Sequence, residues 1–409
     1  MKKHVTIIGA LFLLTLLTIT ISCENPTPTS PDIKNQAEEY KLPIGTPFLI
    51  KDINPGIGDA YISELTVFKN KLYFRASDEH NSTDVWIYDG KQTAIPEPIL
   101  SKIRDCNYPR SLVVWNNLLY FDVDYALNGC WKYDGNTKPD YIKEIEFTND
   151  GVFYNNKIYL AQPDNNEDYE LYSYDSINGL KLIKDIDPNN SSTPSDFTIY
   201  MDEIFFSAFD ETNGRELWSF DEITGTQLIK DIYTGSNDSA PGDFYVFNNE
   251  LFFSAKDNSE NISLWKYNST DGITQVLDND DDIIIQPKSF CVVNDLLYFT
   301  GQTNGLTDTL WIYDGLNKPY IVADTDSHKI YKMDKLLNYR NQLVVMGHHF
   351  DLGSEIFKFD TDNGFQVFCD ITDEGIHSNP QDMIVYNNIL CFVATDYIHG
   401  FELWGYCKE

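Results

Sequence analysis

The sequence NGRELWSFD at residues 213–221 contains a motif that recurs along the chain and decides the fold. Aligning the chain on Trp218 gives an aromatic residue in eight copies, with a second aromatic residue two positions later in each copy. A repeat of this length predicts one array of structural units, not the two or three separate domains that 409 residues would suggest. The aromatic column comprises Trp86, Trp131, Tyr172, Trp218, Trp265, Trp311, Phe357 and Trp404.

The copy around Trp265 shows the strands of one unit. Residues 244–247 and 251–255 are apolar runs separated by Asn248-Asn249, and Asn tolerates the positive φ of a two-residue hairpin turn. The strand that carries Trp265 is the third, and a fourth apolar strand ends in an acid, as residues 228–231 do one copy earlier. Four antiparallel strands in a repeat of roughly 45 residues are typical of a β-propeller blade.

The two ends of the array complement each other. The last copy stops at residues 406–409 without a fourth strand, whereas residues 48–52 precede the first copy and match a fourth strand. A ring needs its last blade bonded to its first, which also removes an exposed sheet edge. The sequence therefore predicts an all-β fold at residues 46–409: one eight-bladed β-propeller of four-stranded antiparallel blades, closed by the N-terminal strand (about 48–53) completing the last blade.

The repeat resembles the bacterial ELWxxDGT repeat family over about residues 48–409. The resemblance implies a secreted or lipoprotein β-propeller and no particular activity or substrate. The chain departs from the family pattern where the Glu is absent, at Ser263 and Thr309, and where the Trp is replaced, at Tyr172 and Phe357. The motifs that carry the resemblance are at residues 213–218, 220–221, 228–232 and 251–255.

Residues 1–22 predict a lipoprotein signal peptide, because two lysines precede an apolar run at residues 5–21. That run is shorter than the ~20 residues of a membrane span. Ser22-Cys23 then resembles a lipobox, in which Cys23 would carry the lipid, and an ordinary signal peptide with an incidental Cys is the alternative. The polar, Pro-rich segment at residues 23–45 predicts an extended tether.

Composition excludes several classes of protein. Apolar residues make up 42% of the chain, which is enough to build a core and excludes wholesale disorder. The 63 acidic and 30 basic residues give a formal net charge of −33. A surface this acidic repels phosphate groups, so we expect no nucleic-acid partner, and anionic headgroups are poor partners for it.

Residue types that recur in every blade must satisfy an environment that recurs in every blade, namely the packing between sheets. We therefore expect the six repeated tryptophans in the core, and a carbohydrate platform is the alternative. Acids recur thirteen residues later and are expected to accept backbone N–H bonds in the loop entering the next blade, with cation binding as the alternative. These tryptophans and acids are Trp86, Trp131, Trp218, Trp265, Trp311 and Trp404, and Asp52, Asp185, Asp231, Asp324 and Asp370.

No stretch matches a calcium-binding loop, and no cofactor is expected. The densest run of carboxylates, Asp278, Asp280, Asp281 and Asp282, is the candidate for Ca²⁺, weighed against a solvated loop. Among the cysteines that follow Cys23, we predict a disulfide between Cys106 and Cys130, because both should lie at the same rim in an oxidising compartment.

The repeat also predicts two unlike rims, a tight-turn rim and a long-loop rim. Variable loops on a rigid scaffold carry function, so we expect a partner at the long-loop rim or in the central channel. His348-His349 lies on this rim, but the chain contains no G-x-S-x-G, H-E-x-x-H or phosphate-loop motif, and we expect no enzymatic activity. The long loops are residues 53–63, 101–110, 187–195, 233–242, 279–287 and 372–381.

These observations favour a monomeric, lipid-anchored β-propeller of the bacterial cell envelope, at the outer membrane and facing either the periplasm or the cell surface. Its membrane contact would be the lipid on Cys23, and it would act as a non-enzymatic scaffold that binds a protein or a glycan. The alternatives are an extracytoplasmic polysaccharide hydrolase or lyase with its site on the long-loop rim, and a structural envelope lipoprotein without a discrete ligand.

Overall fold

The structure is a computed structural model, and it describes most of the chain from residue 43 to residue 408. Every regular element in this part of the chain is a β-strand. The part described includes no helix of the length and hydropathy that a membrane crossing requires. The described residues are 43–80, 82–91, 97–98, 108–123, 129–143, 145, 151–164, 166–303, 306–322, 330–372 and 377–408.

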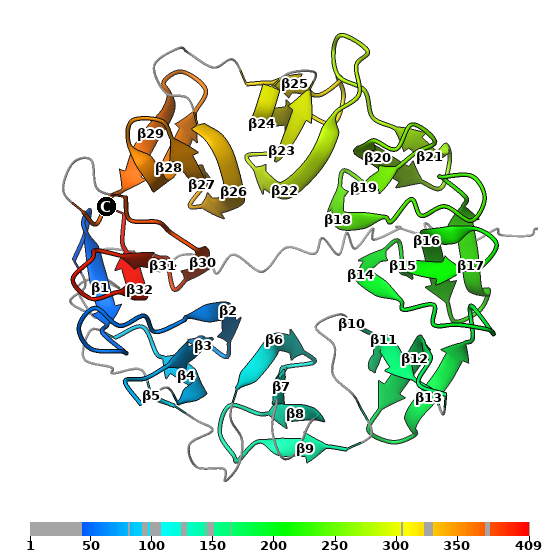
Figure 1. Cartoon of the computed structure of the whole chain (residues 1–409), viewed down its shortest axis with the longest axis horizontal. Coiled ribbons are helices and arrows are strands. Elements are labelled where there is room, and N and C mark those ends of the chain that lie inside the picture. Colours follow the sequence, from blue (N-terminus) through cyan, green and yellow to red (C-terminus); the bar gives the residue numbers. More distant parts are fainter. Residues whose placement is uncertain are drawn as a thin grey trace, which may run out of the picture.

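The strands form antiparallel sheets arranged around a common axis, which makes the fold a β-propeller (Figure 1). Within each unit, consecutive strands pair as hairpins, because short turns and alternating apolar residues favour neighbours in sequence. The first four sheets in chain order comprise β2 (Ser63–Phe68), β3 (Lys71–Ser77), β4 (Thr83–Tyr88) and β5 (Glu97–Pro98); β6 (Pro109–Trp115), β7 (Leu118–Val123), β8 (Gly129–Tyr133) and β9 (Asp140–Ile142); β10 (Gly151–Tyr154), β11 (Lys157–Pro163), β12 (Tyr169–Asp175) and β13 (Gly179–Lys184); and β14 (Ser195–Tyr200), β15 (Glu203–Asp210), β16 (Gly214–Asp221) and β17 (Gly225–Lys230).

The next sheet has eight strands and consists of two hairpin-connected sets of four. The sets are joined by a single pair, Ser263 with Ile285, and each set has the strand order of the other sheets. A four-stranded sheet follows them. The strands are β18 (Gly242–Phe247), β19 (Glu250–Lys256), β20 (Ile262–Asn268), β21 (Gly272–Gln275), β22 (Ile285–Val293), β23 (Leu296–Thr303), β24 (Leu306–Tyr313) and β25 (Tyr320–Ile321), then β26 (Ile330–Tyr339), β27 (Gln342–His349), β28 (Gly353–Asp360) and β29 (Gly364–Cys369).

The remaining sheet joins the two ends of the described chain. It contains β30 (Asp382–Tyr386), β31 (Ile389–Thr395) and β32 (Phe401–Tyr406), with β1 (Pro47–Lys51) as its fourth strand. β1 runs antiparallel to β32, and Leu49 lies opposite Trp404. The N-terminal segment therefore lies beside the last repeat, where the sequence placed it.

The turns between the first and second strands of each sheet are two-residue turns with positive φ at both positions. Asn248 and Asn249 have φ of 48° and 58°, as the Asn-Asn pairs predicted. The same conformation occurs where the first residue is not Asn, as at Met201-Asp202 and Arg340-Asn341. This geometry matches the twist of a β-hairpin, so position in the repeat decides the turn even where the residue type is less favourable.

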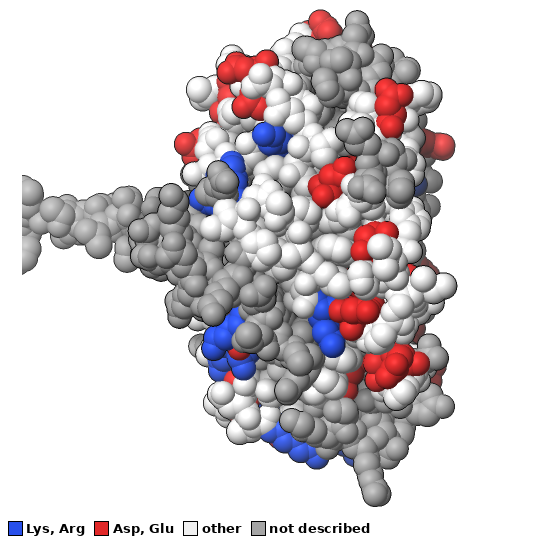
Figure 2. Space-filling view, turned by 90° about the vertical axis from the view of Figure 1, so that its left-hand side faces the viewer, with Lys and Arg blue, Asp and Glu red and all other residues white. Residues whose placement is uncertain are grey.

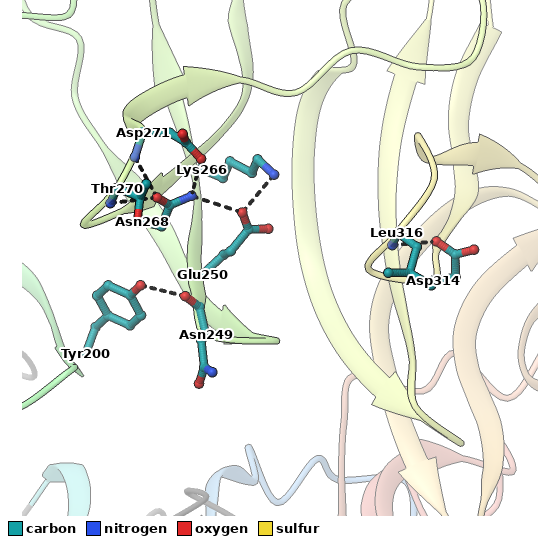
Figure 3. A network of polar contacts seen from close by, with 9 residues as sticks. All are labelled: Tyr200, Asn249, Glu250, Lys266, Asn268, Thr270, Asp271, Asp314 and Leu316. Atoms are coloured by element: carbon teal, nitrogen blue, oxygen red, sulfur yellow. Dashed lines mark hydrogen bonds and ion pairs between the residues drawn. The ribbon is translucent and has the colours of Figure 1, made fainter.

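The turns between third and fourth strands are fixed by a side chain at the end of the third strand. In Figure 3, the Asn268 side-chain oxygen accepts hydrogen bonds from the backbone N–H groups of Thr270 and Asp271, and Asp314 accepts one from Leu316. Asp221 makes the equivalent bonds, and they hold the pKa of its carboxyl below its usual range. These compact turns form the tight-turn rim.

The core lies between neighbouring sheets. Trp218 and Phe206 of one sheet pack with Tyr159 and Leu171 of the preceding sheet, and the other apolar clusters repeat this arrangement. The six repeated tryptophans are at most 9% exposed, which agrees with a packing role and not with a carbohydrate platform. In four of them, the indole N–H donates to the carbonyl of an alanine on the adjacent strand, as Trp218 does to Ala208.

Candidate functional site

The loops of the long-loop rim are held by a buried glutamate two residues before the repeated aromatic. Glu216 on β16 is fully buried and accepts hydrogen bonds from the N–H groups of Ile232 and Tyr233, at 3.0 and 3.2 Å. The Ser239 hydroxyl donates to the same carboxylate at 2.6 Å. One side chain therefore fixes both ends of the loop that enters the next sheet.

The same arrangement recurs in three other copies. Glu170 accepts hydrogen bonds from the hydroxyl and the backbone N–H of Ser192. Glu355 accepts the same two bonds from Ser378. Glu402 accepts bonds from the N–H groups of Ile53 and Asn54 and so fixes the loop after β1.

Burial raises the pKa of these carboxyls, although the donated hydrogen bonds oppose the shift. The pKa is about 7 for Glu216 and Glu355 and about 8 for Glu402. Near Glu402, Ala60 occupies the position that Ser239 has near Glu216. The Ala60 carbonyl accepts a hydrogen bond from the Ser77 N–H, as the Ser239 carbonyl does from the Lys256 N–H. Burial is the main cause of the raised pKa of Glu402, and the neighbouring Asp52 and Asp59 raise it further.

The acids thirteen residues after the aromatic were predicted to accept backbone N–H bonds in these loops, and two of those predicted do so. Asp231 and Asp370 accept loop N–H bonds, from Gly235 and Thr372 respectively. One carboxylate oxygen of Asp52 is buried and has no hydrogen-bond partner among the described residues. Asp185 directly follows β13, and Asp324 lies outside the described residues. The role of the buried glutamates was not predicted, although the Glu of the repeated Glu-Leu-Trp motif was a signal for it.

Glycines let the long loops pack onto the sheets. Gly214 has a φ of +72°, and a Cβ on it would lie 2.1 Å from the carbonyl oxygen of Asn237 in the following loop. Gly353 lies under His377 in the same way, and Gly400 under Gly58. No other residue type fits these contacts, so the glycine is part of what positions each loop.

The Asp278–Asp282 run, the candidate for Ca²⁺, forms a compact turn. Asp278 is buried, and its carboxylate accepts hydrogen bonds from the N–H groups of Asp280 and Asp282 at 2.9 Å. Asp281 forms an ion pair with Lys318 of the next set of strands. The described residues include no group of three or more side chains placed to hold a metal ion.

The two rims differ in charge. In the described part of the long-loop rim, outside the 278–282 turn, Lys143 is the one basic residue among the connecting segments, whereas the tight-turn rim has similar numbers of both signs. Figure 2 shows the side of the ring with β1 and β32; most Lys and Arg lie toward one edge, and Asp and Glu extend to the other. The long-loop acids are Asp52, Asp59, Asp78, Glu79, Asp164, Glu167, Asp168, Asp185, Asp187, Glu211, Asp231, Asp238, Asp257, Glu260, Asp351, Asp370 and Asp396.

One part of the long-loop rim is also apolar, and we call it the seam patch. It consists of Ile57, Tyr61, Phe350, Tyr397 and Ile398, whose exposed fractions are 85, 65, 82, 54 and 66%. Phe350 and Tyr397 occupy the same position in neighbouring copies, seven residues before the repeated aromatic, and Tyr61 has a counterpart in Tyr108. Exposed apolar residues gathered in one place on a folded protein indicate a contact surface.

Contacts between loops place the segments that carry the seam patch next to one another. His377 lies against the turn at Gly353, three residues after Phe350. The Asn379 side chain donates to the Tyr397 hydroxyl at 2.9 Å. The loop of Tyr397 in turn meets residues 58–60, since the Phe401 N–H donates to Asp59. Four segments from separate parts of the sequence are therefore placed side by side.

Histidines border the seam patch. The Nδ1 atom of His348 lies 2.6 Å from the Ser354 hydroxyl, and the rings of His348 and His377 are 6.0 Å apart. Burial and the neighbouring His377 and Lys332 lower the pKa of His348, which favours its neutral form at pH 7. His349 points elsewhere: it is buried, and its Nδ1 accepts N–H bonds from Asp351 and Leu352.

Two predicted cysteine sites fall wholly or partly outside the described residues. Cys23, the predicted lipid attachment site, lies outside them, and so does Cys106. Cys130 has a free thiol and packs among Ile142, Ile145 and other apolar residues. It occupies the apolar position next to the repeated aromatic, so its side chain faces the core, and the predicted bridge to Cys106 finds no support.

No protein-family model matches the chain, and no curated protein matches it. Solved structures similar to it include one from a study of two prolyl endopeptidases. That structure matches at 8% identity and a TM-score of 0.52, and the match covers 90% of this chain and 57% of that one. A puromycin-hydrolyzing peptidase of Mycobacterium tuberculosis matches at 10% identity and a TM-score of 0.51, over 86% of this chain and 60% of that one. The β-propeller domain of the Trilobed protease from Pyrococcus furiosus matches at 15% identity and a TM-score of 0.44, over 76% of this chain and 99% of that one.

These matches correct one prediction. No enzymatic activity was expected from the sequence, whereas solved structures of similar fold include peptidases. The absence of a local catalytic motif therefore does not exclude an enzyme. At about 10% identity the likeness shows the shared fold alone, and the chain spans less than two thirds of the two peptidases.

Proposed function

We propose that this chain is a lipid-anchored, extracytoplasmic binding scaffold: an eight-bladed ring closed by β1, which presents the seam patch to a protein partner. A kinship with the ELWxxDGT repeat proteins is part of this proposal. The observation that carries it is the seam patch itself, five exposed apolar residues on loops that buried glutamates and glycines hold in place. Rigid loops bind with a smaller entropic cost than mobile ones.

The chemistry of the surface favours a protein over a glycan. Ile57, Phe350 and Ile398 are well suited to fill or cover an apolar pocket, whereas they offer a sugar no hydrogen bonds. The surrounding rim is strongly acidic, which steers basic partners toward it and repels acidic ones. We infer a partner segment with an apolar centre and basic residues around it.

The test is to capture partners from the envelope proteins of the source bacterium with the full-length lipidated protein. The double variant Phe350→Ser and Ile398→Ser should lose a partner that the unaltered protein retains, since both side chains are exposed and their change leaves the fold intact. Ile177→Ser plus Ile223→Ser, at even more exposed positions on the other rim, is the control. Equal capture by both variants would contradict the proposal, and binding of soluble glycans by the unaltered protein would favour a glycan.

A second candidate function is hydrolysis at the same rim. The supporting observation is the 2.6 Å contact between His348 and Ser354, because a neutral His can take a proton from a hydroxyl that attacks a substrate. Ser354→Ala should then abolish turnover of ester, peptide and polysaccharide substrates, while Ser378→Ala, in a buried loop contact, should retain it. Unchanged turnover in Ser354→Ala would exclude this site.

A further inference from the structure

We propose that the tight-turn rim lies against the lipid surface, so that the long-loop rim and the seam patch face away from the membrane. This inference rests on the lipid anchor in the proposed function and adds the orientation of the ring. The occupant of the tight-turn rim is then a phospholipid headgroup layer.

The first observation is where the described chain begins. Ile44 pairs with Cys407, and the Gly45 N–H donates to the Cys407 carbonyl at 2.7 Å. Pro47 lies opposite Tyr406, at the end of β32 that leads to the tight-turn rim. The segment carrying Cys23 therefore joins the ring at this rim, and a lipid on Cys23 would bring this rim toward the bilayer.

The second observation is the charge of this rim. Negatively charged headgroups repel acidic surfaces and attract basic residues that lie near them. The long-loop rim is the acidic one, so it is the less favourable face toward a membrane. The described connecting segments and C-terminal end of the tight-turn rim carry the bases Lys69, Lys91, Lys138, Lys318, Arg340 and Lys408 and the acids Asp89, Asp134, Asp202, Glu222, Asp271, Asp295, Asp314 and Asp362, and Asp281 of the 278–282 turn pairs with Lys318.

The third observation is a set of apolar side chains at the tips of the tight turns. Ile177, Ile223 and Leu316 are 90, 93 and 90% exposed, and each lies in a turn between a third and a fourth strand. Two of these turns follow β12 and β16, on the side of the ring opposite β1 (Figure 1). The tether would therefore hold one edge of the ring while these side chains insert between headgroups at the other edge.

The experiment uses the full-length lipidated protein in vesicles of phosphatidylethanolamine and phosphatidylglycerol that contain a lipid with a nitroxide quencher. A fluorophore is attached through Ile223→Cys or Leu316→Cys on the tight-turn rim, or through Ile57→Cys or Ile398→Cys on the long-loop rim. All four side chains are exposed, so the labels should leave the fold intact, and the unaltered protein measures background labelling. Quenching should be several-fold stronger at the first two positions than at the last two.

The outcomes separate this inference from the proposed function. Mass spectrometry of the N-terminal peptide first reports whether Cys23 is acylated, and an unmodified Cys23 would overturn both the anchor and the orientation. Equal quenching at all four positions, or stronger quenching at Ile57, would overturn the orientation alone. Replacing Ile177, Ile223 and Leu316 together with Ser should reduce quenching at a label on Lys91→Cys, and no reduction would remove the apolar tips from the contact. Partner capture through the seam patch is measured separately and does not depend on these results.

Discussion

At the scale of single residues, the buried glutamates are the main feature of this protein that distinguishes its two rims. A carboxylate in the core is costly unless hydrogen bonds satisfy it, and here the donors come from loops. Glu216 and Glu355 each bond a following loop, so the energy of the buried group is coupled to the position of that loop. The scaffold is therefore sensitive to the protonation of groups that lie beneath its surface.

The pH dependence of stability follows from these groups. The pKa of Glu402 in the folded protein is about 8, above its usual value of 4.5, so between these values the folded state binds a proton that the unfolded state has lost. Stability conferred by the protonated form is present at pH 5 and decreases as the pH rises to 8, by about 1.4 kcal/mol for each unit of the pKa difference. Chemical denaturation at several pH values measures it. In Glu402→Gln the decrease should be smaller, and an unchanged pH profile in that variant would contradict the assignment.

A substitution at Ala60 is expected to stabilise the protein. Ala60→Ser should supply Glu402 with the hydroxyl that Ser239 supplies to Glu216, which lowers the pKa of Glu402. We expect the free energy of unfolding at pH 8 to rise by about 1 kcal/mol, the usual contribution of a hydrogen bond to a buried group. Ser239→Ala is the reciprocal variant and should lower it by a similar amount. Denaturation curves of the unaltered protein and the two variants measure the free energy of unfolding. A destabilised Ala60→Ser would show that the added hydroxyl does not fit.

These residue roles were only partly predictable. The tryptophans repeat in six copies, and a repeated residue must serve a repeated contact, so their burial followed from the sequence. The glutamates repeat in four copies only, and their partners, such as Ser239, are more than twenty residues away in a loop of variable sequence. Sequence spacing does not reveal that Glu216 bonds both ends of the loop whereas Asp231 accepts one bond within it, because this depends on how the strand ends turn.

At the scale of elements, the repeated hairpins were predictable because local patterns determine them. Apolar runs separated by Asn-Asn define two strands and a turn wherever they occur, and the structure places a two-residue turn at each such site. The seam patch was only partly predictable: Phe350 and Tyr397 lie at the same position of neighbouring copies, seven residues before the repeated aromatic. How the loops of neighbouring copies lie relative to one another depends on the angle between the sheets, which no local pattern encodes.

Gly214 tests whether a long loop depends on close contact with the sheet. Gly214→Ala would place a Cβ 2.1 Å from the Asn237 carbonyl oxygen, so the loop has to move, and we expect a loss of 2 kcal/mol or more, roughly the sum of a backbone strain and a packing defect. Gly225→Ala is the matched control, because Gly225 also has a positive φ but would meet no atom within 4 Å. Only the first variant should increase hydrogen exchange in the loop between β17 and β18. Equal effects in both would show that the contact with Asn237 is unimportant.

At the scale of the whole molecule, the proposed closure of the ring depends on contacts between the two ends of the chain. β1 contributes Leu49 to an apolar cluster with Trp404, and its Phe48 ring lies against Gly405. The loop after it is bonded to Glu402. If β1 detached, the edge of β32 would be exposed and the two ends of the described chain would no longer be joined, whereas loss of β17 would leave its neighbouring sheets connected along the chain.

The variant Leu49→Asp tests this difference. A charged side chain in the apolar cluster should detach β1 from β32, so that protection from hydrogen exchange falls in β32 and also in β2 and β3, which follow β1 in the chain. Leu228→Asp, at the corresponding position opposite Trp218, is the control, and its effect should remain within its own sheet and that sheet's neighbours. The midpoint of thermal unfolding should fall further for Leu49→Asp than for Leu228→Asp, because one change opens the ring and the other does not. Equal losses, confined in each case to one sheet, would mean that β1 is an ordinary edge strand and that the ring does not depend on it for closure.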